Sequence, residues 1–217
     1  MGLLDRLAPR KDLEPRPQPS AAAESDPVFA TKALRKFLAS LTSRPSTVLL
    51  DLGPVVGSNV NFFGERLGCK IFVEDIFADL DRHVRNGTAA GFSSFLEKRF
   101  TQASTTVDGI LCWDLFDYLD KPSAQALATQ LTRLLAPDGA LLAFFGTLQS
   151  IQTRACRYTK YIVVDDSNLK HRPYAAARGP QTTVPNRDIL RLFETLRVSD
   201  SFLLQNNQRE ILLRKPA

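Results

Sequence analysis

Residues 49–59 read LLDLGPVVGSN, an apolar run that leads through an acid into a loop with two glycines. The Val- and Leu-rich run is typical of a strand that is buried on both faces of a parallel sheet. Gly53 and Gly57 let the backbone pass close to a ligand, and the helix predicted next directs its free N–H groups to the same place. In open α/β sheets, ligands bind at such loops. The stretch therefore predicts the fold class and a ligand-binding loop together.

The remaining chain repeats the alternation of short apolar runs with amphipathic segments. Alternating strands and helices predict βαβ units and a mostly parallel sheet that is covered by helices on both faces. Two β-type runs around a polar turn end the chain and predict an antiparallel hairpin. The predicted parallel strands are residues 47–52, 70–74, 107–112 and 140–145, and the hairpin strands are residues 198–204 and 209–214.

The first part of the chain differs in composition from the rest. Residues 1–26 are rich in proline and cannot bury enough apolar surface to offset the entropy of ordering, so we expect a disordered leader. A helix is predicted to begin at Asp26, with Pro27 in its first turn. Residues 27–217 are expected to form a single domain.

The composition excludes several classes of protein. The chain has 217 residues, of which 44% are hydrophobic and 24% charged, as in ordinary globular domains. No apolar run is long enough for a membrane span. The three cysteines are far apart and form no C-x-x-C pair, which favours reduced thiols and a cytoplasmic location. The two histidines form no metal-binding motif, so no metal is expected.

Glu74 stands at the end of the second predicted strand. A carboxylate at this point accepts hydrogen bonds from the two hydroxyls of a ribose, and together with the glycine loop it favours the binding of a nucleoside-type ligand. Its neighbour Asp75 is the alternative ligand group; one of the two acids caps the helix that follows.

These residues together resemble the class I S-adenosylmethionine-dependent methyltransferases, a likeness that covers roughly residues 30–217. The segment VDGILCWDLFDYL is similar to the family's fourth strand and its loop, and LTRLLAPDGALLAFFG to its next helix, turn and fifth strand. The resemblance implies a Rossmann-like, doubly wound, mostly parallel seven-stranded sheet of order 3-2-1-4-5-7-6 with a C-terminal antiparallel hairpin. It also implies S-adenosylmethionine as cofactor. The implied cofactor-binding residues are Asp51, Gly53, Pro54, Gly57, Glu74 and Asp114.

Two positions depart from the family pattern. Val55 stands where a glycine is expected, so the ligand is either shifted outward or blocked. No Asp or Glu lies between Lys98 and Val107, where the acid for the adenine amine is expected. No catalytic residue is assigned, because methyl transfer from a sulfonium depends on positioning and desolvation more than on a dedicated base.

Residues 147–186 form a predicted insertion on the substrate side. Its segment 154–178 interleaves Arg and Lys with three of the four tyrosines of the chain. It is either a solvated hairpin that packs on the sheet edge, or a lid that binds an anionic or aromatic acceptor. The predicted function is therefore a methyltransferase of unassigned acceptor. The alternative is a non-catalytic module of the same fold that binds a partner or nucleic acid through residues 154–178; the oligomeric state is not predicted.

Overall fold

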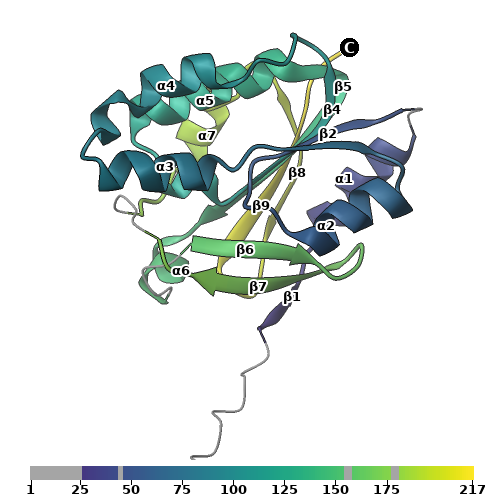
Figure 1. Ribbon diagram of the computed structural model, residues 1–217. Helices are drawn as coiled ribbons and strands as arrows, with labels where there is room; N and C mark the ends of the chain where they lie inside the picture. The colour runs from purple at the N-terminus through teal and green to yellow at the C-terminus, as the bar shows by residue number, and fades with distance from the viewer. Residues whose placement is uncertain (1–25, 44–45, 154–157, 177–180) are drawn as a thin grey trace, which may run out of the picture.

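The computed structural model describes residues 26–43, 46–153, 158–176 and 181–217 (Figure 1). The predicted leader, apart from Asp26, lies outside these residues, as do Arg154, Arg157 and Arg178 of the basic insertion. None of the helices in the described part of the chain is long and apolar enough to span a membrane.

A six-stranded sheet forms the centre of the protein, in the order β3-β2-β4-β5-β9-β8. The first four strands of this order run parallel, and β9 is antiparallel to both of its neighbours. All six predicted strands are confirmed. Their bounds are β2 Val48–Asp51, β3 Lys70–Val73, β4 Val107–Trp113, β5 Leu135–Gly146, β8 Arg197–Leu203 and β9 Gln208–Arg214.

The expected seventh strand of the sheet is absent from the described residues, although the α/β class is confirmed. Residues 100–106, between α4 and β4, form no strand. The guanidinium of Arg133 donates hydrogen bonds to two of their backbone carbonyls, those of Gln102 (3.0 Å) and Phe100 (3.3 Å). A side chain, and not a neighbouring strand, thus supplies the donor for these two carbonyls.

The two faces of the sheet are covered by different helices, which gives three layers (Figure 1). Alternate residues of a strand enter different cores, as the two-residue period of a strand requires: Leu49 packs with α1, whereas Leu50 packs with α3, α4 and α5. The helices are α1 Ala33–Thr42, α2 Gly57–Asn61, α3 Ile76–Arg85, α4 Phe92–Arg99, α5 Lys121–Leu134, α6 Leu148–Thr153 and α7 Asn186–Leu192, with a π-helical turn Phe62–Arg66 after α2 and 3₁₀ turns Ala89–Gly91 and Leu115–Tyr118.

The first helix begins later than the sequence predicted. Val28–Ala30 is strand β1, and α1 starts at Ala33. The buried carboxylate of Glu210 in β9 accepts hydrogen bonds from the amides of Lys32 (2.8 Å) and Ala33 (2.9 Å). The acceptor for the first amides of α1 is thus supplied from the far end of the chain, so Asp26 is not the cap.

A second, three-stranded sheet of order β1-β7-β6 lies beside the main sheet (Figure 1). Its hairpin, β6 Tyr158–Val163 and β7 Asn168–Tyr174, confirms that the insertion contains a hairpin. The hairpin does not pack along an outer strand of the main sheet, β3 or β8. It contacts Asn59 after β2, Phe77 after β3 and Trp113 at the end of β4, and therefore covers the carboxyl ends of the parallel strands.

Candidate cofactor and acceptor site

The carboxyl ends of β2, β3 and β4 bring the predicted site residues to one edge of the sheet. Asp51 is the last residue of β2, Glu74 follows β3, and Asp114 follows β4. The registers Asp51↔Val73 and Asp51↔Leu111 place these three strand ends side by side. The spatial grouping that the resemblance implies is therefore present, because adjacent parallel strands end at the same edge.

Asp51 is buried, with 2% of its surface exposed. Its Oδ1 accepts hydrogen bonds from the amide of Gly53 (2.9 Å) and from the indole Nε1 of Trp113 (2.6 Å). Burial raises the pKa of this carboxyl group to about 6, although both hydrogen bonds act to lower it. A carboxylate with a pKa shifted this far by desolvation is typical of a functional position.

The indole of Trp113 fills the space next to Gly53. A Cβ added at Gly53 would lie 2.7 Å from Nε1 of Trp113. Trp113 has φ +50°, a conformation that is uncommon for a bulky residue. It also stacks on Tyr161 of β6, with ring centroids 5.1 Å apart and an interplanar angle of 1°. Gly53 is thus required here by the tryptophan, and Trp113 forms part of the packed core.

The hairpin is anchored over this edge by two buried amide side chains. Asn59 in α2 donates to the carbonyl of Tyr161 and accepts from the amide of Val163, both at 2.8 Å. Gln208 at the start of β9 donates to the hydroxyl of Tyr161 (2.8 Å). Because these bonds are buried, they fix the position of the hairpin relative to the loop after β2.

The acid at the end of β3 is held by two side chains from the α4 region. Arg99 forms an ion pair with Oε2 of Glu74 (2.7 Å), and the amide of Gln102 donates to Oε1 (2.9 Å). The Glu74 side chain remains 20% exposed. Asp75 caps α3 instead, since its Oδ1 accepts from the amide of Ala78 (2.9 Å). Asp75 is therefore the acid that caps the helix, and Glu74 does not share this role.

Two further buried acids belong to the loop after β4. Asp114 is fully buried, and Tyr118 lies 3.5 Å from its Oδ2. Asp117 is also fully buried, and its Oδ2 accepts from the amide of Gly146 at the end of β5 (2.7 Å). Asp117 thus links the loop after β4 to the end of the next strand.

The loop after β2 is open on its outer side. A Cβ added at Gly57 meets no atom within 4 Å, Pro54 is buried, and Val55 is 64% exposed, so the valine does not fill the space beside Gly53. Glu74 holds one donor on each oxygen, whereas a carboxylate offers about four acceptor positions. These features fit S-adenosylmethionine approaching from the side of Gly57 and Glu74, while the Gly53 side is occupied by Trp113.

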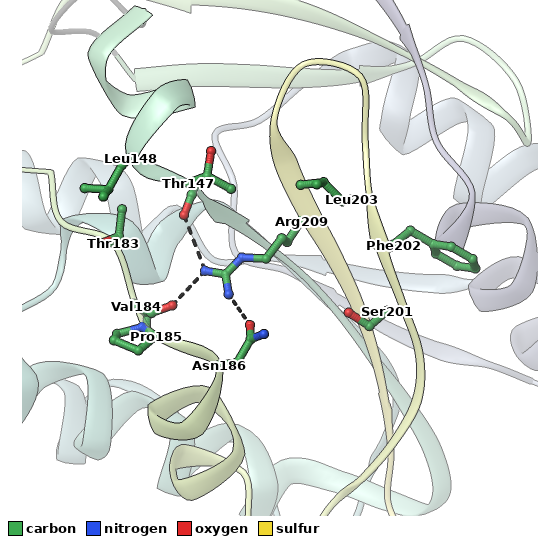
Figure 2. Close-up of a pocket in the computed structure, with 11 residues that line it drawn as sticks. Thr147, Leu148, Thr183, Val184, Pro185, Asn186, Ser201, Phe202, Leu203 and Arg209 are labelled. Atoms are coloured by element: carbon green, nitrogen blue, oxygen red, sulfur yellow. Dashed lines mark hydrogen bonds between the residues drawn. The ribbon is translucent and has the colours of Figure 1, made fainter.

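A cavity of about 480 Å³ lies farther along the same edge, at the end of β5 (Figure 2). It is lined by residues 146–148, 183–186 and 201–203, and by Arg209 at the start of β9. Sequence reasoning did not identify Arg209 or Asn59 as site residues, because contacts between distant segments bring them to the strand ends and no local pattern marks them. Tyr161 belongs to the predicted segment 154–178, in which tyrosines alternate with basic residues.

Comparisons with known proteins agree with this architecture. A family described as a methyltransferase domain matches residues 23–194. No curated protein matches the chain.

Solved structures with a similar fold share little sequence with this chain. An S-adenosylmethionine-dependent methyltransferase from Clostridium acetobutylicum has a TM-score of 0.50 and 12% identity over 85% of this chain and 92% of its own. The CcbJ methyltransferase from Streptomyces caelestis has a TM-score of 0.50 and 12% identity over 86% and 91%. A protein from Pyrococcus horikoshii has a TM-score of 0.50 and 14% identity over 85% and 92%. At such identities the similarity concerns the fold alone.

Proposed function

The chain belongs to the methyltransferase domain family, and on that premise we propose where it binds its cofactor. It is an S-adenosylmethionine-dependent methyltransferase, an enzyme that moves a methyl group to an acceptor. The family match over residues 23–194 carries this conclusion, and it supports the enzyme rather than the non-catalytic binding module.

We assign the cofactor to the loop after β2 and the acid after β3. On the open side of the loop the backbone at Gly57 would border it and Glu74 would accept hydrogen bonds from its ribose, while Gly53 and Pro54 would hold the turn behind. The ion pair with Arg99 supports this role, because it holds the Glu74 carboxylate in one orientation before the ligand arrives. Asp51 and Asp114 complete the proposed set; their place at the ends of the adjacent strands β2 and β4 supports it.

When bound, S-adenosylmethionine supplies an electrophilic methyl group on a sulfonium. The residues of this chain orient the reactants and exclude water. The Trp113–Tyr161 stack and the hairpin above it cover the edge with apolar surface, which keeps the strand ends dry. Residues 147–186 are proposed to form the acceptor side, since they include this hairpin and part of the cavity at the end of β5.

We place the enzyme in the cytoplasm. Cys69 and Cys112 are both free and buried, as expected of thiols kept in a reducing compartment.

Titration calorimetry with S-adenosylmethionine and S-adenosylhomocysteine tests the proposed site. The Glu74→Ala variant is expected to fold, because Arg99 keeps its second ion pair with Asp79 (2.8 Å). It should bind both compounds about ten- to hundredfold more weakly than the wild type, since hydrogen bonds to a charged group contribute roughly 1.5–3 kcal/mol. The exposed Glu194→Ala variant is the matched control.

Unchanged affinity in Glu74→Ala would show that the acid after β3 does not hold the ligand. If the wild type binds neither compound saturably at millimolar concentration, the proposed site is wrong as a whole.

A further inference from the structure

Arg209 is a half-buried cation whose hydrogen bonds all go to neutral oxygens. Its guanidinium donates to the carbonyls of Val184 (2.7 Å) and Gly146 (3.4 Å) and to the side-chain oxygen of Asn186 (Figure 2). Its Nε is buried without a partner among the described residues. Of the five guanidinium N–H groups, these bonds use three.

No carboxylate forms an ion pair with Arg209 in the described part of the chain. Burial lowers the pKa of the guanidinium, and the charge of Asp117, the smaller effect, raises it. Oδ2 of Asp117 accepts from the Gly146 amide. An arginine stays charged in proteins, and a half-buried charge that makes no direct contact with a carboxylate is costly. An incoming anion would relieve that cost.

The cavity beside Arg209 is open to solvent and has exposed apolar side chains in its lining. Leu148 is 70% exposed and Leu203 is 62% exposed, and Phe202 also belongs to the lining. A volume of about 480 Å³ is within the range of small-molecule sites. Exposed leucines around a single cation match a ligand that has an apolar body and one charged end.

The cavity also lies at a suitable distance from the proposed cofactor. It opens at the carboxyl end of β5, and β4 lies between β5 and β2 in the sheet. Neighbouring strands are about 4.8 Å apart, so the end of β5 is roughly 10 Å from the loop after β2, and the start of β9, which carries Arg209, is roughly 14 Å from it. An acceptor anchored at Arg209 can therefore extend its other end toward the cofactor loop.

We propose that Arg209 binds the oxyanion of the methyl acceptor, a small organic acid whose apolar body lies against Leu148 and Leu203. This proposal rests on the proposed function, because it identifies the acceptor of that enzyme. A carboxylate and a phosphate are both oxyanions that a guanidinium can bind, and one probe of each kind distinguishes them.

The test uses three small probes on the full chain saturated with S-adenosylhomocysteine: benzoate, phenyl phosphate and the neutral benzamide. Binding is followed by calorimetry. At least one anion is expected to bind saturably in the millimolar range, and benzamide at least about tenfold more weakly, because a charge-assisted hydrogen bond contributes roughly 1.5–3 kcal/mol. Tighter binding of benzoate indicates that the acceptor carries a carboxylate, and tighter binding of phenyl phosphate indicates that it carries a phosphate.

Two kinds of variant identify the site. Arg209→Gln should lose anion binding about tenfold or more, and Arg209→Lys less; Arg197→Gln, an exposed arginine at the opposite end of β8, is the matched control. Leu203 is exposed, so Leu203→Glu keeps the fold and should weaken anion binding through repulsion, whereas Leu203→Lys should strengthen it.

The inference is overturned if neither anion binds, if benzamide binds as well as the anions, or if both the Arg209 and Leu203 variants bind like the wild type. Binding of S-adenosylhomocysteine is measured in the same proteins. If the wild type does not bind S-adenosylhomocysteine, the proposed cofactor site is contradicted. If Arg209→Gln still binds S-adenosylhomocysteine but no longer binds the anion, the acceptor site alone is supported.

Discussion

Replacing Asp51 by Asn removes a titrating group from the centre of the candidate site and should change how stability depends on pH. The pKa of Asp51 is about 6 in the folded protein, compared with 3.8 for an unperturbed aspartate. The folded state therefore binds the proton more tightly than the unfolded state. The contribution of Asp51 to stability is greatest below pH 3.8 and is lost as the pH rises through about 6.

The size of this pH dependence follows from the difference between the folded and unfolded pKa values of Asp51. Each pKa unit corresponds to about 1.36 kcal/mol, so ionised Asp51 lowers the free energy of unfolding by about 3 kcal/mol above pH 7. At pH 4 the cost falls below about 1 kcal/mol, because the carboxyl group is then protonated in the folded state and the pH lies close to its pKa in the unfolded chain. An asparagine has no such dependence. The difference in stability between Asp51→Asn and the wild type should therefore move in favour of the variant by about 2–3 kcal/mol between pH 4 and pH 8.

Urea unfolding of both proteins at several pH values measures this difference, and any constant effect of the amide cancels when pH values are compared. Asp138→Asn replaces an exposed carboxylate and is the control. A stability difference between Asp51→Asn and the wild type that stays constant from pH 4 to pH 8 would refute the reasoning, since Asp51 would then not be desolvated in the folded protein.

Two other substitutions test the packing that positions the site. Glu210→Ala should lower the free energy of unfolding by about 3 kcal/mol, because two amides at the start of α1 lose a buried acceptor; urea unfolding checks this, and a loss under 1 kcal/mol would contradict it. Gly53→Ala should destabilise the protein and shift the fluorescence of Trp113, the single tryptophan of the chain, since the new Cβ would lie 2.7 Å from its indole. Gly57→Ala, where a Cβ meets no atom within 4 Å, should leave both properties unchanged, and equal behaviour of the two alanine variants would rule out the close contact.

The order of strands and helices could be predicted from the sequence, because a strand buried on both faces is a short continuous apolar run. Residues 47–52, 107–112 and 140–145 are such runs, and the polar turn between 204 and 209 marks the last hairpin. Strand ends determine which loops can meet, so the grouping of Glu74 with the glycine loop also followed from the sequence, and Asp51 was added by the family resemblance. Whether these residues bind the cofactor stays a prediction.

Contacts between segments that are far apart in the sequence decided the features of the fold and the site that the sequence did not predict. The segment expected to form the seventh strand is irregular, and Arg133 of α5 donates to two of its carbonyls. The start of α1 is set by Glu210, and the space beside Gly53 is filled by Trp113 and closed by Tyr161. Periodicity and turn residues describe interactions between neighbours in the chain. A hydrogen bond or a ring stack between residues far apart in sequence forms only when the packed sheet brings them together, and no local pattern encodes it.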